Sequence, residues 1–168
     1  MHEAQKIFMF GIKDKFPEYF KNKKVLDVGS YDINGNNQYL LENCEYVGID
    51  VLEGPSVTHI CKAHEYDAPS NSFDTIISTE CFEHDMYYPK TLKNIIRLLK
   101  PNGLFAFTCA STGREEHGTL NTEKRHSAHT MKEVGEDKEW IEWQNYYKNL
   151  TAKDIEECID MNIFKDYQ

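Results

Sequence analysis

The sequence predicts an α/β fold, in which a doubly wound, mostly parallel sheet carries helices on both faces. Three segments, 24–28, 73–78 and 104–109, are apolar nearly throughout. Strands of this kind are typical of parallel sheets that are covered on both sides. Helical patterns alternate with the strands along the chain, which is the order that a doubly wound sheet requires. The chain of 168 residues is long enough for one domain with a sizeable core.

Composition narrows the class of protein. Apolar residues make up 40% of the chain and charged residues 28%, so we expect a globular, soluble protein. A net charge of −9 argues against nucleic acid as a partner, because a phosphate backbone requires a clustered basic face. The N-terminus has no apolar signal core, and no run is long enough for a membrane span. We therefore expect a cytoplasmic protein without a membrane partner.

The cysteines indicate a reducing compartment. The chain has five, and none stands in a CxxC pair. Several lie inside expected strands or helices, so we interpret them as reduced core residues. They are Cys44, Cys61, Cys81, Cys109 and Cys158.

The first half of the chain is predicted to alternate helices and strands. Residues near 2–20 have helical periodicity, and Pro17 is expected to break or restart that helix. The expected buried face of this helix comprises Phe8, Ile12, Phe16 and Tyr19. The elements that follow are a strand at 24–28, a short helix at 37–43 and strands at 46–50 and 57–61.

The second half completes the sheet and adds a polar segment. Strands are expected at 73–78 and 104–109, with a helix through 92–99 and a turn at 100–103 between them. Residues 110–149 are predicted to form a long loop or lid that ends in an aromatic stretch at 140–147. Thr151 and Asp154 have capping-box spacing, and Leu150 and Ile155 can pack as a hydrophobic staple around this helix start. Ile155, Cys158 and Ile159 form the expected buried stripe of that helix, and another strand is expected to begin at 164–167.

Two short stretches point to a nucleotide site. Val25-Leu26-Asp27-Val28-Gly29-Ser30 runs from an apolar strand into a glycine turn, and Tyr46-Val47-Gly48-Ile49-Asp50 ends a second strand on an acid about 20 residues after that glycine. Such an order places both turns at the carboxyl edge of a parallel sheet. We predict that Gly29 lets backbone approach a ligand closely and that Asp50 accepts hydrogen bonds from ribose hydroxyls.

These stretches and two later ones resemble the class I, Rossmann-like methyltransferases that use S-adenosylmethionine. The resemblance covers roughly residues 22–110. Residues 72–78 are similar to the fourth strand of that family, and Leu92 through Gly103 is similar to the helix and turn before its fifth strand. The resemblance implies a doubly wound core, S-adenosylmethionine as the cofactor and methyl transfer as the activity.

The chain departs from that family in three places. Five residues separate Gly29 from Gly35 in the first loop, and Tyr31 stands where a small residue is expected, which would alter the methionine-end pocket. Lys62, beside Ala63 and His64, occupies the usual place of an acid that contacts adenine. The family also ends its sheet with a hairpin of two further strands, of which this chain is expected to reach only the first. We therefore predict that the C-terminal strand hairpin is incomplete.

The resemblance implies a set of cofactor-binding residues, each with a simpler alternative. Asp50 would bind ribose or be an exposed turn acid, and Asp27 would orient the first loop or bond nearby amides. His64 would contact adenine or lie at the surface, while Tyr31 would pack on the cofactor or on the protein. The full predicted set is Asp27, Gly29, Ser30, Tyr31, Asp50, Val51, Ala63, His64 and Glu80.

The acceptor side is predicted from the segments after the fourth and fifth strands. His84 and His117 are candidate general bases, with loop packing as the alternative. Arg114 could bind an anionic acceptor, and Tyr146 could belong to an aromatic wall of its pocket or to a lid on the core. His117, His126 and His129 lie near three glutamates, but their spacing matches no zinc pattern, so we expect no metal.

The domain is thus expected to span 1–168, with a core at 22–110, an acceptor-side loop or lid at about 110–149 and a C-terminal helix and strand at about 150–168. The leading hypothesis is methyl transfer to a small molecule, such as a saccharide or another metabolite. The alternatives are a non-catalytic adenosyl-binding or scaffolding protein and an NAD-dependent oxidoreductase, although the chain lacks GxGxxG. An unfinished sheet edge would permit a homodimer.

Overall fold

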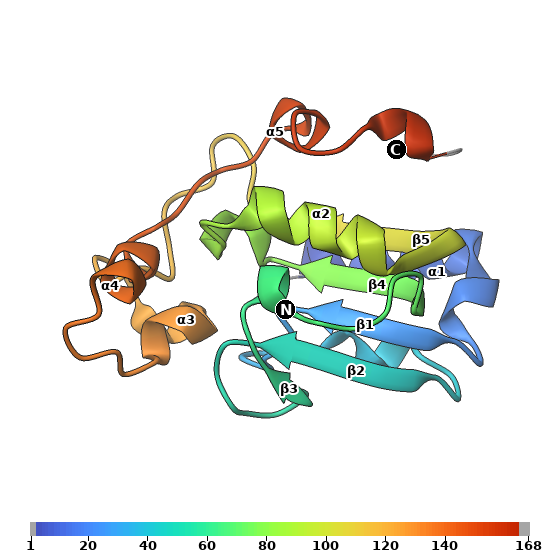
Figure 1. Ribbon diagram of the computed structural model, residues 1–168, viewed down its shortest axis with the longest axis horizontal. Coiled ribbons are helices and arrows are strands. Elements are labelled where there is room, and N and C mark those ends of the chain that lie inside the picture. The colour runs from blue at the N-terminus through green and yellow to red at the C-terminus, as the bar shows by residue number, and fades with distance from the viewer. Residues whose placement is uncertain (1–2, 165–168) are drawn as a thin grey trace.

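The computed structural model describes residues 3–164, which form a five-stranded sheet with helices on both faces (Figure 1). The strand order is β3-β2-β1-β4-β5, and all neighbouring strands are parallel. The predicted doubly wound α/β architecture is therefore confirmed. The strands are β1 (Lys24–Val28), β2 (Glu45–Asp50), β3 (His59–Ile60), β4 (Phe73–Thr79) and β5 (Leu99–Thr108). The α-helices are α1 (Glu3–Lys15), α2 (Tyr88–Leu98), α3 (Ala128–Met131), α4 (Lys138–Gln144) and α5 (Ala152–Glu156).

Single 3-10 turns connect many of these elements. They span η1 (Pro17–Phe20), η2 (Asn37–Leu40), η3 (Ala63–Glu65), η4 (Phe82–His84), η5 (Lys124–His126) and η6 (Met161–Ile163). The break at Pro17 is confirmed, since α1 ends at Lys15 and η1 begins at that proline. The short helix expected at 37–43 is a single 3-10 turn. None of the described helices is long and apolar enough to cross a membrane.

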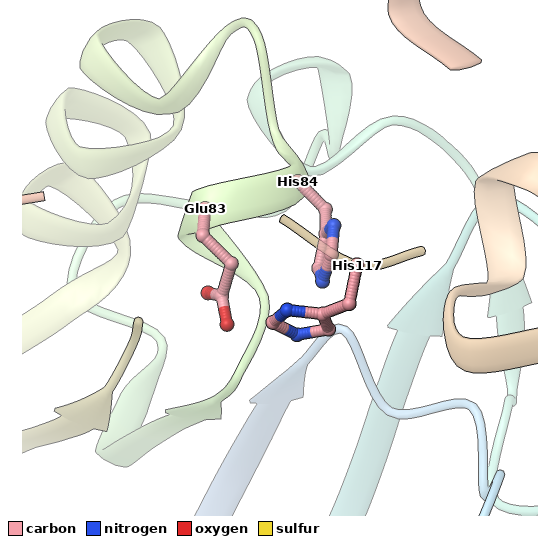
Figure 2. A group of neighbouring side chains, drawn as sticks. All are labelled: Glu83, His84 and His117. Carbon is pink, nitrogen blue, oxygen red and sulfur yellow. The ribbon is translucent and has the colours of Figure 1, made fainter. Parts of the chain in front are cut away.

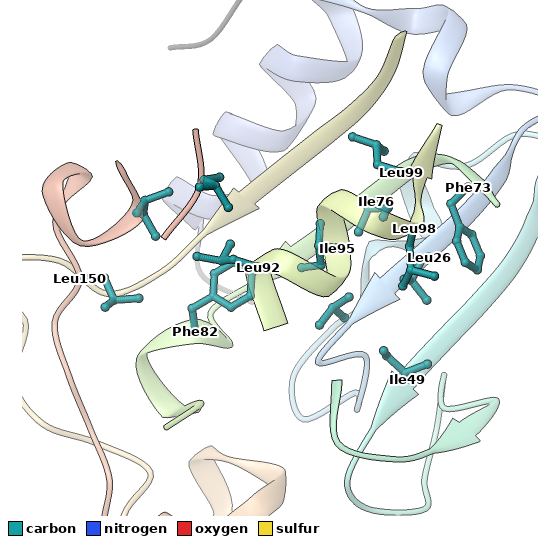
Figure 3. Packing of buried hydrophobic residues seen from close by; sticks show 13 residues of the cluster. Leu26, Ile49, Phe73, Ile76, Phe82, Leu92, Ile95, Leu98, Leu99 and Leu150 are labelled. Carbon is teal, nitrogen blue, oxygen red and sulfur yellow. The ribbon is translucent and has the colours of Figure 1, made fainter. Parts of the chain in front are cut away.

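Side chains that alternate along the central strands form a core on each face of the sheet. On one face, Leu26 and Ile76 pack with α2 and with the segment around α5 (Figure 3). On the other face, Val25 and Ile77 pack with Met9 of α1. This two-sided burial explains why β1 and β4 are apolar along most of their length.

The buried face of α1 differs from the prediction. Met9 is fully buried, whereas Phe8 is 45% exposed. The helix turns Met9 and the half-buried Ile12 toward the sheet, in the same cluster as Phe20. Periodicity alone did not distinguish this face from the neighbouring one, because apolar residues occur on both.

The edges of the sheet also differ from the prediction. The third strand covers only His59–Ile60, because only Ile49 and Asp50 of β2 pair with it. β5 begins at Leu99, before the turn that was expected at 100–103. Residues 100–103 have no partner in β4, because the pairing of β5 with β4 passes from Leu99 directly to Leu104. No strand follows β5 within residues 3–164, and most of the strand expected at 164–167 lies outside that range.

The cysteines are free thiols, as expected, but they are half-buried and lie at the margins of the core. Cys61, Cys109 and Cys158 pack against the cluster beneath α2, and Cys44 packs against the opposite one. The prediction that they are core residues is therefore correct only in part.

The segment 110–149 is predicted as a loop or lid, and in the structure it contains three short helical elements, η5, α3 and α4, beyond the carboxyl ends of the strands (Figure 1). Trp140 and Trp143 stack with ring centroids 4.8 Å apart. Lys62 lies within 6 Å of both indole rings, and its Nζ is 2.6 Å from a carboxylate oxygen of Glu139. These contacts attach α4 to the segment after β3.

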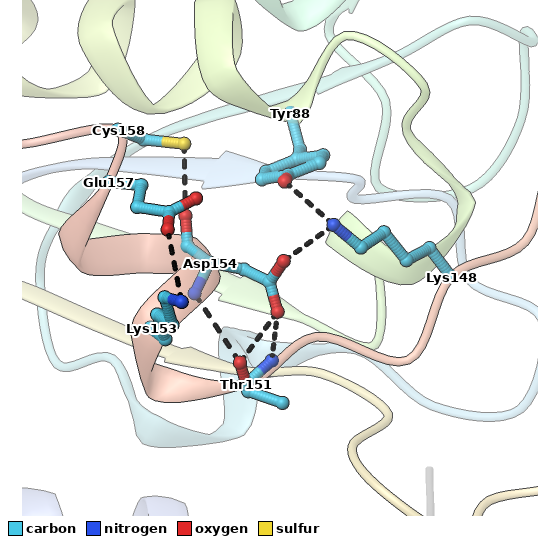
Figure 4. A network of polar contacts seen from close by, with 7 residues as sticks. All are labelled: Tyr88, Lys148, Thr151, Lys153, Asp154, Glu157 and Cys158. Atoms are coloured by element: carbon cyan, nitrogen blue, oxygen red, sulfur yellow. Dashed lines mark hydrogen bonds and ion pairs between the residues drawn. The ribbon is translucent and has the colours of Figure 1, made fainter.

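The predicted start of the last helix is confirmed. Thr151 and Asp154 form a reciprocal capping box at α5 (Figure 4). The Nζ of Lys148 lies 2.5 Å from Asp154 and 3.2 Å from the Tyr88 hydroxyl, which connects this cap to the beginning of α2. Leu150 and Ile155 then join the core cluster beneath α2.

A glycine in β2 provides a test of this packing. A methyl group at Gly48 would collide with the Ser56 carbonyl oxygen and approach the Ser30 hydroxyl. We expect Gly48→Ala to lower the free energy of unfolding by about 2 kcal/mol or more, measured by denaturant titration. The control is Gly11→Ala, at an exposed position of α1 where a methyl group meets no atom within 4 Å. This substitution should stabilise the folded protein by about 0.5–1 kcal/mol. Equal effects of the two substitutions would contradict the close approach at Gly48.

Candidate functional site

A cavity of about 600 Å³ lies at the carboxyl ends of β1, β2 and β4. Its volume is within the range typical of small-molecule sites. The structure brings eleven of the thirteen predicted site residues to its lining: Asp27, Gly29, Ser30, Tyr31, Asp50, Val51, Ala63, Glu80, His84, Arg114 and His117. His64 and Tyr146 are not among the lining residues.

Asp50 is held at the end of β2 by backbone amides. One carboxylate oxygen accepts a hydrogen bond from the Tyr31 amide at 3.0 Å, and the other accepts one from the Val51 amide at 2.7 Å. Burial raises the pKa of Asp50 to about 6, although these amides act to lower it. The Leu52 amide also acts on the carboxylate. Because a carboxylate has about four lone-pair sites, it can still accept a hydrogen bond from a ligand.

Asp27 lies deeper, at the floor of the cavity. It is 1% exposed, and its carboxylate accepts hydrogen bonds from the Asn37 amide and the Tyr46 hydroxyl, both at 3.1 Å. Burial raises its pKa to about 6, and the charge of Asp50 adds to the shift. Asp27 thus binds the first loop through Asn37, which also lines the cavity and was not predicted to do so.

The loop after β1 is shaped by a glycine. Gly29 has φ +77°, in the left-handed region, and the place of its absent side chain is taken by Cys81. The glycine therefore makes room for the segment after β4 and also lines the cavity, while the close approach of a ligand to its backbone stays a prediction. Ser30, next in the chain, has a buried hydroxyl without a hydrogen-bond partner among the described residues. Tyr31 packs against Gly54 as well as lining the cavity.

The predicted adenine-side residues are separated by the structure. Val51 and Ala63 line the cavity, but the His64 ring lies against Tyr87, with centroids 4.4 Å apart. Burial holds the pKa of His64 below its ordinary value. The 3-10 turn η3 places adjacent side chains in different directions, so Ala63 lines the wall while His64 packs beside the lid.

Of the aromatic stretch at 140–147 that was predicted to form a wall or a lid, Trp143 lines the cavity and Tyr146 does not. Trp143 is buried, lines the cavity and donates a hydrogen bond from its indole nitrogen to the His84 carbonyl at 2.7 Å. Tyr146 lies three residues later, past the end of α4, where burial raises its pKa to about 12. Tyr146 lies beyond the helix that places Trp143 at the cavity, so the geometry of α4 does not position its side chain.

Histidines from distant segments meet at the acceptor side of the cavity. His84 follows β4 and His117 follows β5, and their rings lie 5.0 Å apart (Figure 2). His129 from α3 lies 5.7 Å from His84. Burial, and then the neighbouring histidines, hold the pKa of His84 well below its ordinary value. His84 is therefore a weaker proton acceptor than an imidazole in water.

Glu83 belongs to the same group and was missed by the sequence analysis. Its side chain is fully buried and points toward His117 (Figure 2). Burial raises its pKa to about 8, and the nearby Glu80 contributes to the shift. The residues around His84 in the sequence, Glu80–Asp85, do not indicate whether Glu83 is buried or solvated.

Comparisons with known proteins give a family. A family model described as "Methyltransferase domain" matches residues 2–152. No curated protein sequence matches the chain.

Solved structures with the same fold are similar at low identity. The phosphoethanolamine N-methyltransferase 2 of Haemonchus contortus, solved in complex with phosphomonomethylethanolamine and S-adenosylhomocysteine, aligns with a TM-score of 0.59 and 23% identity over 89% of this chain. The YcgJ protein of Bacillus subtilis aligns with a TM-score of 0.52 and 19% identity over 62% of this chain. The chain spans 34% of the length of the first protein and 51% of the second.

The buried Asp27 predicts a pH-dependent stability. Its pKa is higher in the folded chain than in the unfolded one, so its contribution to stability is complete below about pH 4 and is lost as the pH rises through about 6. We expect the stability of the wild-type protein, relative to Asp27→Asn, to be about 2 kcal/mol greater at pH 4.5 than at pH 7. Denaturant titrations of both proteins at the two pH values measure this difference. If the difference in stability between the two proteins is the same at both pH values, Asp27 is not desolvated in the folded chain.

Proposed function

The chain belongs to the methyltransferase-domain family, and we propose that it binds S-adenosylmethionine in this cavity and transfers the methyl group to a small-molecule acceptor. One observation carries the proposal. The amide of Tyr31 in the β1 loop bonds the Asp50 carboxylate at the end of β2, so both predicted nucleotide-binding turns border one cavity. This is the crevice in which open parallel sheets bind ligands.

The residues at this crevice fit an adenosyl group. The Asp50 carboxylate is fixed by backbone amides and keeps acceptor capacity for a ribose hydroxyl. Ser30 also lines the cavity, and its buried hydroxyl has no hydrogen bond of normal geometry to any described residue. Val51 and Ala63 supply an adjacent apolar wall for the adenine ring.

Acids around the cavity suit a cationic ligand. Asp27, Asp50, Glu80 and Asp85 line it. When bound, S-adenosylmethionine supplies an activated methyl group on a positively charged sulfur. The chain's own contribution is then to hold an acceptor in line with that methyl group and to exclude water, which can account for several kcal/mol of the barrier.

The acceptor would enter between the loops that follow β4 and β5. His84, His117 and Trp143 line this side, and the exposed Arg114 lies at its margin. We propose His84 or His117 as the group that removes a proton from an acceptor hydroxyl or ammonium. Arg114 would bind an anionic part of the acceptor. A saccharide or another polar metabolite satisfies both requirements.

Cofactor binding is tested at Asp50. We expect Asp50→Ala to weaken the binding of S-adenosylhomocysteine at least tenfold, about 1.4 kcal/mol, as measured by isothermal titration calorimetry. Asp14→Ala on the exposed face of α1 is the matched control and should leave the affinity unchanged. The wild-type protein should be stabilised against heat by S-adenosylhomocysteine and not by NAD. The absence of stabilisation by either compound would favour a non-catalytic protein.

The class of acceptor is tested with labelled cofactor. S-adenosylmethionine with a labelled methyl group is incubated with the protein and a whole-cell extract, which is then separated into small molecules, protein and nucleic acid. We expect label in the small-molecule fraction, and we expect Asp50→Ala to remove it. Label confined to the macromolecules would refute a small-molecule acceptor.

A further inference from the structure

Glu83 is a buried carboxyl group without a counter-charge in direct contact. Neither of its oxygens has a hydrogen bond of normal geometry to any described residue. Carboxyl groups buried to this degree are usually paired, hydrogen-bonded or bound to a metal ion, because desolvation of an isolated charge is costly. The salt bridges of the described residues do not include Glu83. The backbone amides of Glu83 and Ala110 are close enough to lower the pKa of this carboxyl, but burial outweighs them and no described side chain forms an ion pair with it.

Two imidazoles face the same space. One ligand atom of Glu83, one of His84 and one of His117 lie within 4.8 Å of one another (Figure 2). Nδ1 of His84 is buried and has no partner among the described residues. Nδ1 of His117 lies 3.0 Å from the Glu115 carbonyl oxygen, to which it can donate a hydrogen bond.

The Glu115 contact orients His117 as a ligand. If Nδ1 carries the proton that this carbonyl accepts, Nε2 of His117 presents its lone pair. Histidines that bind metals usually have their second nitrogen fixed in this way, by a carbonyl or a carboxylate. The 3-10 turn η4 fixes Glu83 and His84, and the Trp143 indole binds the His84 carbonyl from the other side.

We propose that Glu83, His84 and His117 form a binding site for a divalent transition-metal ion, Zn²⁺ being the best match, on the acceptor side of the cavity. A bound ion would occupy a lone pair of each imidazole, so the general-base role proposed above for His84 or His117 applies to the metal-free chain. Two imidazoles and one carboxylate suit Zn²⁺ or Fe²⁺ better than Mg²⁺ or Ca²⁺, which prefer oxygen ligands. Three protein ligands leave a coordination position open, and His84 and His117 both line the cavity, so that position faces the acceptor.

The geometry requires a small adjustment. Ligand atoms at about 2.1 Å from a tetrahedral ion are separated by about 3.4 Å, so the three groups must close by about an ångström. His117 lies on the loop after β5, between the exposed Glu116 and the buried Gly118. Its half-buried side chain can therefore make most of this movement, while Glu83 and His84 stay fixed by burial.

The experiment measures the ion directly. The full chain is stripped with a chelator and titrated with Zn²⁺ by calorimetry, and Co²⁺ is added separately to record its visible ligand-field spectrum. We expect one ion per chain and a Co²⁺ spectrum of a four- or five-coordinate site. Glu83→Gln and His117→Ala should each weaken Zn²⁺ binding by 10-fold or more.

A matched variant separates the site from ordinary surface histidines. His126 lies on the same loop and lines the same cavity, but it is outside the cluster. We expect His126→Ala to bind Zn²⁺ as the wild-type protein does. Equal losses in His126→Ala and His117→Ala, or no saturable binding to the wild-type protein, would overturn the proposal.

Folding and cofactor binding are followed in the same proteins. Far-ultraviolet circular dichroism and titration with S-adenosylhomocysteine should be unchanged in Glu83→Gln. Loss of metal binding with retained cofactor binding supports this site alone. Retained metal binding in a protein that never binds S-adenosylhomocysteine would support the metal site while rejecting the proposed function.

Discussion

The hydrogen bond from the Tyr31 amide to Asp50 is the contact on which the geometry of the site depends. It joins the loop after β1 to the end of β2 at a separation of 3.0 Å. A second amide, from Val51, fixes the other carboxylate oxygen. With both oxygens held, the orientation of the acid does not depend on a ligand. The sheet makes this contact possible, because Val28 pairs with Ile49 and brings the two strand ends level.

The lid completes the cavity through a different kind of interaction. Lys62 lies beside Trp140 and Trp143, and its ammonium binds Glu139. Cation–π contacts and an ion pair on one lysine attach α4 to the segment after β3, in addition to the packing of the buried Trp143 against Tyr87. Lys132 adds a hydrogen bond to the Val51 carbonyl at 3.1 Å, directly beside Asp50. The lid thus contacts both Asp50's neighbour Val51 and, through Trp143, the His84 carbonyl.

Burial of acids gives the cavity its chemical character. Desolvation raises the pKa of Asp27 and of Asp50 to about 6, and that of Glu83 to about 8. Each of these groups is therefore less stable when charged than it would be in water, and a bound cation would compensate for the loss. A positively charged cofactor beside Asp50 and a metal ion beside Glu83 would use the same physical property at opposite ends of the cavity.

The amino-acid sequence was sufficient to predict the parallel sheet, the break at Pro17, the capping box at Thr151 and the meeting of the first loop with Asp50. Periodicity, strand order and cap chemistry are local, so neighbouring residues carry the information. Only the tertiary structure decided that Met9 rather than Phe8 is buried, that Trp143 rather than Tyr146 lines the cavity, and that Cys81 occupies the space beside Gly29. It also brought Glu83 and His84 together with His117, more than thirty residues away in the chain. These outcomes depend on how separate segments pack, and contacts between distant segments leave no periodic pattern in the sequence.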